Sequence, residues 1–328
     1  MSVLVVGGSG FIGTRLCLRL SQSKKSFQIF DKVPSGLFLD RGVVGDVRHS
    51  MRLQFSPNLT AIINLAAEHR DNVWPLSLYD EVNIDGARNV CDLARLKGIN
   101  KIIFTSSVAV YGFAPLQTNE SGEIAPFNDY GRTKWEAEQV YREWQAEDPN
   151  RRCLVIVRPT VVFGERNRGN VFNLLRQIAS GKFVMVGNGL NRKSIAYVEN
   201  VAAFLEYSLD FKPGLYVYNY IDKPDFTMNA LVAHVNTLLG RSSDIEFRLP
   251  RFLGLLIGSS FDLVAKITGK KFSISAIRVK KFCANSVYES AIESTGFIPP
   301  VPLMDAIEKT VRFEFIENHK NEQVFYSE

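Results

Sequence analysis

The sequence predicts an α/β fold in which a doubly wound parallel sheet is followed by a smaller C-terminal lobe. Six short apolar segments recur over the first 160 residues without internal polar alternation, helical patterns separate them, and this regularity loosens from about residue 165. Strands of that composition are typically buried on both faces, and helical crossovers between them make the sheet parallel. We therefore expect one sheet with helices on both faces, and shorter elements above its carboxyl edge.

The first predicted unit, residues 2–31, is a strand, a glycine-rich turn, a helix and a second strand. SVLVVG is a short run rich in valine, GGSGFIG follows at once, TRLCLRLSQ has helical spacing, and FQIFD ends in Asp31, 18 residues after Gly13. A dinucleotide site needs these parts in this order. We interpret this unit as the start of a Rossmann-type, dinucleotide-binding sheet.

Each glycine of the turn has a separate purpose in such a site. Gly7 permits the tight turn, Gly10 lets the backbone approach a pyrophosphate, and Gly13 lets the helix lie close to the strand. The helix N-terminus offers free N–H groups and partial positive charge to the phosphates. Asp31, at the carboxyl end of the second strand, can accept hydrogen bonds from both ribose hydroxyls. The alternative is a glycine-rich loop that closes some other α/β unit.

The remaining elements follow in order along the chain. After an irregular loop at 32–42 we expect strands at 43–48, 60–67, 101–107 and 152–159, and helices at 78–96 and 129–147. Beyond residue 165 we expect a helix near 170–180, a strand near 183–186, a helix near 199–210 and a strand near 215–219.

Length and composition fit a soluble globular enzyme. With 328 residues the chain can form one large domain or two interlocked ones with an ample core. Hydrophobic residues make up 46% and charged residues 22%, which is ordinary for this class. The net charge of +5 is mild and gives no reason to expect nucleic acid as a partner. No basic segment precedes the N-terminal apolar run, so we expect a cytoplasmic protein.

No metal site is predicted, because the residue types that bind metals are scattered. Cys17 and Cys91 fall on helical patterns and Cys153 on a strand, so we expect buried free thiols, as in a reducing cytoplasm. The fourth cysteine is Cys283, and the four cysteines include no CxxC pair. The histidines are scattered as well: they are His49, His69, His234 and His319.

A tyrosine and a lysine at the start of a predicted helix are the candidate catalytic pair. Tyr130 and Lys134 are four residues apart, so both side chains lie on one helix face. A phenol with a pKa of about 10 is a poor base, but a nearby ammonium favours the phenolate, and an oxidised nicotinamide adds a second positive charge. Such a pair can take a proton from a sugar hydroxyl while hydride leaves the same carbon. Ser107, at the end of the preceding strand, can hydrogen-bond the same oxygen. A surface helix pair is the alternative.

Motifs over nearly the whole chain resemble the extended short-chain dehydrogenase/reductase family, which includes nucleotide-sugar epimerases. They are GGSGFIG, Asp31, GDV at 45–47, NLAA at 64–67, TSSVAVYG at 105–112, YGRTK at 130–134 and RPTVVFG at 158–164. The resemblance implies that Ser107, Tyr130 and Lys134 are catalytic and that the protein is a homodimer through helices like 78–97 and 129–147. It implies NAD contacts around Gly7, Gly10, Phe11, Ile12, Asp31, Lys32, Asp46, Val47, Leu65, Ala66, Ala67, Asn83, Tyr130, Lys134 and Pro159.

Residues 108–109 indicate which reaction to expect within that family, and residues 31–32 indicate which cofactor. Members that remove water across C5 and C6 of the sugar carry an Asp-Glu pair directly after the catalytic hydroxyl residue. Here the pair is Val108 and Ala109, which can neither protonate a leaving hydroxyl nor abstract a proton from C5. Asp31 favours NAD, because a 2′-phosphate would meet its carboxylate, while Lys32 beside it leaves NADP open.

Four further segments resemble bacterial members of the family that invert C4 of N-acetylhexosamines carried on undecaprenyl diphosphate. They are LAAEHRDNVWPLSLYDEVN at 65–83, ERNRGNVFNLLRQIASGKFVMVG at 165–187, KSIAYV at 193–198 and FDLVAKITGKKFSISAIRVKKFCA at 261–284. This resemblance implies interconversion of N-acetylglucosamine and N-acetylgalactosamine on that carrier through a 4-keto sugar, for a surface polysaccharide such as O-antigen in lipopolysaccharide. The alternatives are a UDP-N-acetylglucosamine 4-epimerase, an NAD(P)-dependent nucleotide-sugar 4-ketoreductase and a non-catalytic NAD-sensing scaffold.

The substrate contacts are less specific. Related soluble epimerases have a diphosphate-binding arginine at the position of Lys193, and a lysine keeps its charge without the bidentate fork. His69 could line the sugar pocket or order its loop, and Asn170 could contact the substrate or cap the helix that it opens. Ser107 would contact the sugar oxygen.

The segment 250–282 is the candidate for membrane docking. FLGLLIGSSF at 252–261 has no charge but is too short to span a bilayer. No acid occurs between 263 and 281, whereas the basic residues are Lys266, Lys270, Lys271, Arg278, Lys280 and Lys281. An apolar anchor beside a basic cluster suits an anionic leaflet. The alternative is a core helix followed by a solvated basic strip.

These patterns together predict the organisation of the chain. Residues 1–165 would bind NAD, with 194–222 returning to that domain, and 166–193 and 223–328 would form the substrate-binding lobe. The expected partners are a lipid-linked or nucleotide-linked amino sugar, the cytoplasmic face of the inner membrane and a second copy of the chain.

Overall fold

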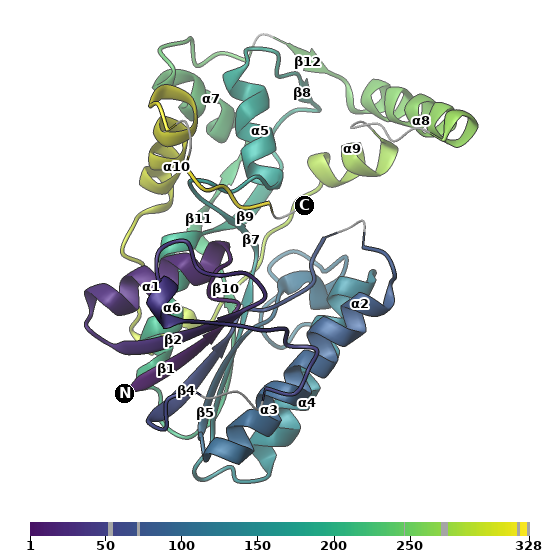
Figure 1. Ribbon diagram of the computed structural model, residues 1–328. Helices are drawn as coiled ribbons and strands as arrows, with labels where there is room; N and C mark the ends of the chain where they lie inside the picture. The colour runs from purple at the N-terminus through teal and green to yellow at the C-terminus, as the bar shows by residue number, and fades with distance from the viewer. Residues whose placement is uncertain (52–54, 71–72, 246, 270–274, 320–321, 327–328) are drawn as a thin grey trace.

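A computed structural model describes residues 1–328 except 52–54, 71–72, 246, 270–274, 320–321 and 327–328. Its centre is a seven-stranded sheet in the order β10-β6-β5-β4-β1-β2-β3 (Figure 1). All neighbouring strands are parallel, which confirms the predicted doubly wound sheet. The strands are β1 (Ser2–Val6), β2 (Ser26–Asp31), β3 (Gly42–Val44), β4 (Leu59–Asn64), β5 (Lys101–Thr105), β6 (Cys153–Pro159) and β10 (Gly214–Tyr220).

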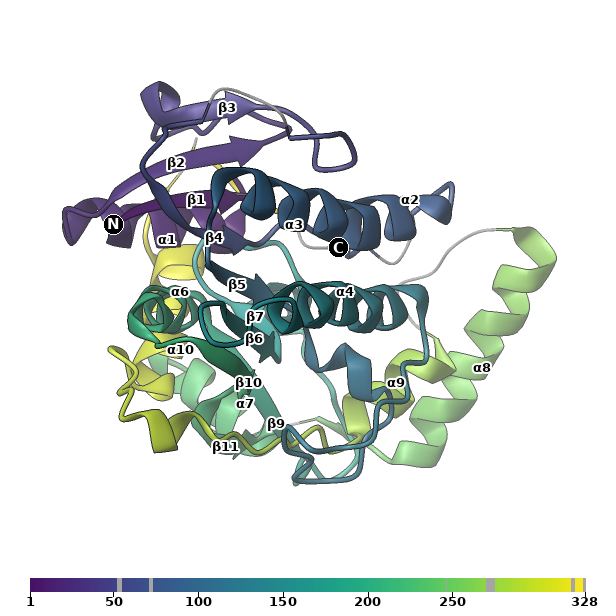
Figure 2. The same ribbon diagram turned by 90° about the horizontal axis from the view of Figure 1, so that it is seen from below.

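Helices cover both faces of the sheet (Figure 2). On one face, α1 (Phe11–Gln22) and α6 (Val198–Tyr207) bury Leu16 and Phe204 against the strands. On the other, α3 (Gly86–Lys97) and α4 (Asp129–Ala146) bury Tyr141 and Trp144. Every residue of β1 and of β6 is buried. Two covered faces explain why the strand sequences are apolar without alternation.

The helix expected at 78–96 is divided in the structure. It begins as α2 (Ser77–Tyr79), passes through one π-helical segment, η2 (Asp80–Asp85), and continues as α3. At the junction, a Cβ atom on Gly86 would lie 3.0 Å from Cγ2 of Val47, so the helix approaches the segment after β3 closely. Asn83, a predicted site residue, lies in this π-helical segment. Helical periodicity in the sequence could not reveal that the helix widens here.

The second lobe has its own core. A three-stranded sheet of β7 (Val161–Phe163), β9 (Arg192–Tyr197) and β11 (Asp222–Thr227) packs with α5 (Asn170–Ala179), α7 (Met228–Leu238) and α10 (Leu303–Val311). A two-stranded sheet pairs β8 (Met185–Val186) with β12 (Arg248–Leu249). The expected elements near 170–180, 183–186, 199–210 and 215–219 are found as α5, β8, α6 and β10. Short turns of helix complete the fold: η1 (Leu39–Arg41), η3 (Val108–Tyr111), η4 (Ser208–Asp210), η5 (Ile292–Thr295) and η6 (Arg312–Ile316).

Two helices project from the second lobe as an arm, which we define as α8 (Arg251–Thr268) and α9 (Ala276–Cys283) (Figures 1 and 2). α8 approaches α9 through glycine, since a Cβ atom on Gly258 would lie 2.7 Å from the backbone nitrogen of Ala276. Within the described part of the chain, no helix is both long enough and apolar enough to cross a bilayer.

The cysteines are free thiols, as predicted. Cys17, Cys91 and Cys153 are buried, and Cys283 is half-buried at the end of α9. Burial raises the pKa of the Cys17 thiol to about 12, so this group stays protonated at neutral pH.

Candidate active site

The turn between β1 and α1 has the geometry expected of a dinucleotide site. Gly7 has φ +79°, and its Cβ atom would lie 2.7 Å from the backbone nitrogen of Ala66, so the turn packs directly on the segment after β4. A Cβ atom on Gly13 would lie 2.3 Å from the carbonyl oxygen of Gly7, which forces the helix close to the turn. At Gly10, by contrast, a Cβ atom would meet only that oxygen, at 3.4 Å. The open side of the turn therefore leaves room for a pyrophosphate at the helix N-terminus.

Asp31 joins the glycine turn to the loop after β2. Its carboxylate accepts hydrogen bonds from the backbone N–H of Ser9 at 2.9 Å and of Val33 at 3.2 Å. Burial raises the pKa of Asp31, and these backbone hydrogen bonds and Lys32 oppose that change. The carboxylate is thus fixed beside the turn, where a ribose next to the pyrophosphate would lie.

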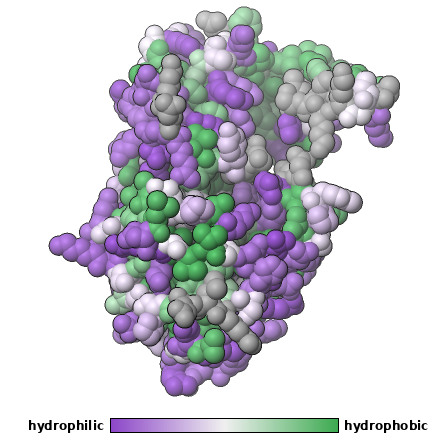
Figure 3. All heavy atoms as spheres, in the orientation of Figure 1, coloured by the Kyte–Doolittle hydropathy of each residue, from purple (hydrophilic) through white to green (hydrophobic). Residues whose placement is uncertain are grey.

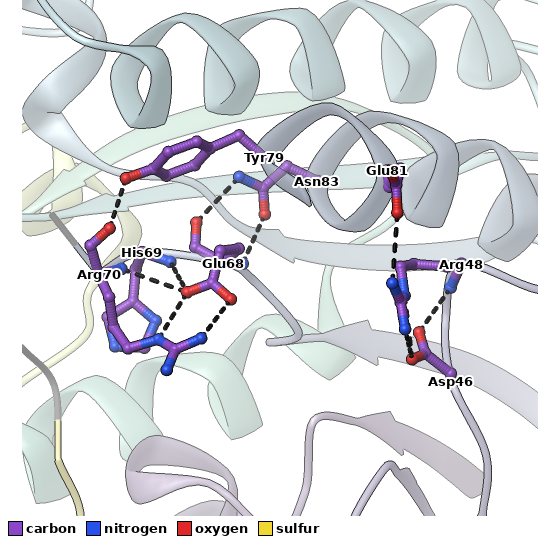
Figure 4. A network of polar contacts seen from close by, with 8 residues as sticks. All are labelled: Asp46, Arg48, Glu68, His69, Arg70, Tyr79, Glu81 and Asn83. Carbon is purple, nitrogen blue, oxygen red and sulfur yellow. Dashed lines mark hydrogen bonds and ion pairs between the residues drawn. The ribbon is translucent and has the colours of Figure 1, made fainter. Parts of the chain in front are cut away.

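The other predicted NAD contacts lie at the carboxyl ends of the same strands. Asp46 follows β3, and Arg48 donates to its carboxylate at 2.8 and 3.0 Å, which lowers the pKa of Asp46 (Figure 4). The side chain of Lys32 is exposed. The remaining predicted contacts are Phe11 and Ile12 in the first turn of α1, Val47 after β3, Leu65, Ala66 and Ala67 after β4, and Pro159 at the end of β6. These residues fit a bound NAD along one edge of the sheet.

Asn83 organises the segment after β4. Its side-chain oxygen accepts from the backbone N–H of Glu68 at 2.9 Å, and its amide donates to the carbonyl of Glu68 at 3.0 Å and to the hydroxyl of Thr133 at 2.9 Å. Asn83 therefore ties this segment to α4 through Thr133, and Figure 4 shows its two bonds to Glu68. These bonds give Asn83 a positioning role that the sequence alone did not reveal.

Glu68, which the sequence did not single out, orders the neighbouring loop. Its buried carboxylate accepts from the side chain of Arg70 at 2.8 and 2.9 Å and from the backbone N–H of His69 at 3.2 Å (Figure 4). The side chain of His69 also hydrogen-bonds the backbone of Ala67, so His69 contributes to the order of this loop together with Glu68. The exposed His69 side chain remains a candidate for the sugar pocket.

The three predicted catalytic residues come together between β5 and α4. Ser107 follows β5, caps η3 by accepting from the backbone N–H of Ala109 at 3.2 Å, and hydrogen-bonds Tyr130. Tyr130 is the second residue of α4, and Lys134 lies one turn later, 1% exposed, with Nζ 4.3 Å from the centre of the Phe104 ring. The chain thus presents a phenol, a hydroxyl and a buried amine in one place, which is sufficient for general acid–base chemistry.

Burial decides the protonation of this group. It lowers the pKa of Lys134 to about 7, with Glu138 opposing the change, and it raises the pKa of Tyr130, with the hydrogen bond from Ser107 opposing. For Tyr130, desolvation outweighs the hydrogen bond with Ser107, so the pKa of the phenol stays above its ordinary value.

A buried ion pair behind the catalytic residues was also missed by sequence reasoning. Glu138, one turn after Lys134, accepts from Arg158 at 2.6 and 2.8 Å and from the Ser106 hydroxyl at 2.6 Å. Both charged side chains are 2% exposed or less. Ser106 precedes Ser107 and Arg158 precedes Pro159, so one carboxylate holds both strand ends to α4. Two charged residues inside otherwise apolar patterns are the signal that could have predicted this pair.

The other predicted substrate residues belong to different elements of the fold. Asn170 is exposed at the first position of α5, and the N-cap is Gly169 without a side-chain cap, so the capping interpretation is wrong. Lys193 lies on β9, and its Nζ donates to the carbonyl of Lys281 at 2.8 Å. Burial lowers the pKa of Lys193 to about 8. Among the described residues, no group of three or more His, Cys, Asp or Glu side chains is placed to hold a metal.

Comparison with known proteins agrees with this geometry. The N-acetyl-α-D-glucosaminyl-diphospho-ditrans,octacis-undecaprenol 4-epimerase of Escherichia coli O157:H7 is 47% identical over 330 residues, covering 100% of this chain and 99% of that protein. The UDP-glucose 4-epimerase of Vibrio cholerae is 27% identical, covering 95% and 94%. The crystal structure of UDP-N-acetylglucosamine 4-epimerase from Bacillus cereus has the same fold, with a TM-score of 0.72 at 16% identity, covering 95% of this chain and 98% of the other.

The family assignment rests on the sequence as well as the fold. The NAD dependent epimerase/dehydratase family matches residues 3–219, which include the glycine turn and all three predicted catalytic residues. A UDP-glucuronic acid 4-epimerase from Bacillus cereus, solved in complex with NAD, superposes with a TM-score of 0.72 at 18% identity, covering 95% and 98%. The chain belongs to the NAD dependent epimerase/dehydratase family.

Proposed function

We propose that the protein inverts C4 of an N-acetylhexosamine carried on undecaprenyl diphosphate, interconverting N-acetylglucosamine and N-acetylgalactosamine for surface polysaccharide synthesis. The observation that carries this proposal is the end-to-end likeness to the Escherichia coli O157:H7 4-epimerase, at 47% identity. The adjacent Ser107, Tyr130 and Lys134, beside a turn that fits a dinucleotide, support the same chemistry.

In the proposed mechanism, Tyr130 takes the proton from O4 and later returns it, and Ser107 donates a hydrogen bond to the same oxygen. NAD held beside Gly7, Gly10 and Asp31 would supply the hydride chemistry at C4. Lys134 favours the phenolate form of Tyr130. The flat 4-keto sugar must turn over before hydride returns to its other face. Val108 and Ala109 supply no acid or base toward C5 and C6, so the sugar keeps its 6-hydroxyl.

The part of the substrate that stays fixed while the sugar turns is the diphosphate. We assign this contact to Lys193, and the sugar contacts to His69 and Asn170, in a substrate lobe of residues 166–193 and 223–328. The NAD-binding unit would comprise 1–165 with 194–222. Holding the diphosphate and leaving the ring free allows both faces of C4 to meet the same hydride donor.

The test is incubation of the purified protein with each carrier form and analysis of the product sugar. We expect turnover of the undecaprenyl diphosphate form well above that of UDP-N-acetylglucosamine. Equal turnover of the two would contradict the lipid carrier and favour a nucleotide-sugar epimerase. A requirement for stoichiometric added NADPH would favour a 4-ketoreductase, and an unchanged rate in Tyr130→Phe would favour a scaffold.

We also propose that the protein works as a homodimer through α3 and α4. A shallow groove between these helices is lined by Ile84, Cys91 and Val140 together with charged side chains, so it offers apolar and ionic contacts to a second copy. Light scattering on the purified protein should give twice the chain mass of 36.9 kDa. A monomeric mass at micromolar concentration would contradict the proposal.

The arm supports a peripheral contact with the cytoplasmic face of the inner membrane. Phe252, Leu256 and Leu263 are each 60–63% exposed, while Gly254 and Gly258 are buried. At this spacing the large side chains form one stripe on the outer face of α8. Hydrophobic atoms are visible along the upper edge of the arm in Figure 3. A helix with an apolar outer face is better suited to the surface of a membrane than to full exposure to water.

Basic side chains accompany this stripe. Arg251 and Lys266 lie at the two ends of α8, and Arg278, Lys280 and Lys281 lie on α9, all exposed. Lys270 and Lys271, part of the predicted basic cluster, lie outside the described residues. Each basic residue near an anionic leaflet adds about 1 kcal/mol of attraction. A pocket of about 530 Å³ at the base of α8 is lined in part by Arg248 and Arg251, which adds two cationic groups next to the arm.

Flotation with vesicles tests this contact. The wild type should float with vesicles that contain anionic phospholipid, and the variant Leu256→Ser/Leu263→Ser should stay with the unbound protein. Val161→Ser, which also replaces a 48% exposed apolar residue but lies on β7, is the matched control and should float normally. Equal flotation of all three proteins would contradict the docking proposal.

A further inference from the structure

Two phenylalanine rings stack on the surface next to the catalytic helix, and the chemistry above does not use them. The ring centres of Phe113 and Phe127 are 4.7 Å apart, with 28° between their planes. Phe113 is 73% exposed and Phe127 is 48% exposed. Phe127 directly precedes Asn128, the N-cap of α4, so the pair lies close in sequence to Tyr130. We call Phe113 and Phe127 the aromatic pair.

The backbone holds the aromatic pair together. Gly112, before Phe113, has φ +61°, and its Cβ atom would lie 2.0 Å from the carbonyl oxygen of Ala125, so no larger residue fits there. The N–H of Ala125 also donates to the carbonyl of Val110 at 3.1 Å. Single exposed apolar residues are common, but two large rings stacked by a constrained backbone form a defined apolar surface.

A lysine side chain lies beside Phe127, and a second lysine contacts the backbone of the first. The Nζ atom of Lys281 is 5.0 Å from the centre of the Phe127 ring, and Lys281 is exposed. The carbonyl of Lys281 accepts from Nζ of Lys193 at 2.8 Å. β9, the end of α9 and the loop before α4 therefore meet here. Phe127 therefore has the ring of Phe113 and the ammonium group of Lys281 as neighbours.

We propose that the aromatic pair binds the first isoprene units of a polyprenyl diphosphate, with Lys281 beside the diphosphate. The inference rests on the proposed function and deepens it by naming a contact of the same substrate. A polyprenyl diphosphate carries a branched apolar chain directly after its anionic group, and this surface likewise has a cationic side chain directly beside an apolar pair. In a UDP-sugar the diphosphate is followed by a polar ribose, which gains little from two exposed rings. The aromatic pair would thus help to select the lipid carrier.

Binding of two small probes tests the proposal. Farnesyl diphosphate carries three isoprene units on a diphosphate, and inorganic pyrophosphate carries none. Phe113→Ala/Phe127→Ala should weaken farnesyl diphosphate binding about tenfold and pyrophosphate binding much less, because apolar contact is lost while Lys281 keeps its charge. Lys281→Gln should weaken both probes. Ile298→Ala, which removes an 83% exposed apolar residue from another surface, should affect neither. Calorimetry on the full-length protein gives all of these affinities.

Several results would overturn the proposal. One is wild-type affinity of the double variant for farnesyl diphosphate, and another is wild-type protein that binds farnesyl diphosphate no better than pyrophosphate. A changed solution mass of the double variant, with unchanged affinity, would assign the rings to contact between copies instead. If the double variant does not fold, Phe113→Ala alone gives the same comparison, since this ring is the more exposed. The proposed function fails separately, if wild-type protein does not epimerise the lipid-linked sugar.

Discussion

The sheet domain and the arm use apolar residues in opposite ways. In β6, every residue is buried, and the strand end carries Arg158 into an ion pair with Glu138 inside the core. In α8, the buried positions are glycines, and the large side chains such as Leu256 point outward. Both segments are apolar in sequence. Only the neighbours of each segment decide whether its apolar surface forms a core or a docking face.

The lysines of the two regions also differ in burial, as the apolar residues do. Lys134 is buried with its Nζ against the Phe104 ring, and its pKa falls to about 7. Lys266 and Lys280 on the arm are exposed to solvent. A buried charge is costly and therefore acts at one defined place, whereas exposed charges act together as a field. The comparison predicts large, local effects for substitutions in the sheet domain and small, additive ones in the arm.

Removing the Tyr130 hydroxyl from the sheet domain should have the largest effect, a fall in the rate of epimerisation. Tyr130→Phe keeps the ring and its packing but removes the group proposed to carry the O4 proton. We expect epimerisation to fall by about 10³-fold, since general acid–base groups contribute roughly 10²–10⁴-fold. Product analysis measures the rate, and thermal unfolding with and without NAD shows whether the fold and cofactor binding are kept. A residual rate above one tenth of wild type would contradict the assignment.

Opening the buried ion pair should destabilise the fold strongly. Glu138→Ala leaves the Arg158 guanidinium without its carboxylate in the core, which costs roughly 3–5 kcal/mol of unfolding free energy. Glu147→Ala is the matched control near the C-terminal end of α4, because Glu147 is 42% exposed and pairs with Arg95 and Arg152 at the surface. That change should cost under about 1 kcal/mol. Urea unfolding measures both, and equal costs would show that burial of the pair is not what matters.

The sequence predicts the sheet domain well because its physical constraints are local. Gly7, Gly10 and Gly13 fall at fixed spacing after an apolar run, and the structure shows the close contacts that exclude a side chain at Gly7 and Gly13. Tyr130 and Lys134 are one helical turn apart, so their shared face follows from periodicity alone. The outcome was the predicted parallel sheet, with these residues near the carboxyl ends of its strands.

Contacts between distant segments were not predictable in the same way. Asn83 reaches Glu68 and Thr133 across 15 and 50 residues, through a π-helical turn that has no clear sequence signature. The partner of Glu138 lies 20 residues away on another strand. Likewise, the pattern of 252–261 could not distinguish a core helix from an exposed one, because that depends on which elements cover it.

The buried lysine should give the stability of the sheet domain a pH dependence. The pKa of Lys134 is about 7 in the folded chain and about 10.4 in the unfolded chain. Between these values the unfolded chain binds one more proton, so the unfolding free energy rises with pH. Relative to Lys134→Met, wild type should gain roughly 1–2 kcal/mol from pH 7 to 8.5. If the difference in unfolding free energy between wild type and Lys134→Met were the same at both pH values, the lowered pKa of this buried amine would be contradicted.

The smallest effect is expected in the arm, where it separates docking from folding. Leu263→Ser replaces a 60% exposed side chain of α8, so it should change the unfolding free energy by no more than about 0.5 kcal/mol. The matched change Leu154→Ser in β6 places a hydroxyl at a fully buried position and should cost roughly 3 kcal/mol or more. If Leu263→Ser were as costly as Leu154→Ser, the outer face of α8 would be covered by protein in solution. The arm would then be a contact between copies of the chain, and its apolar stripe would have the same purpose as the strands of the sheet.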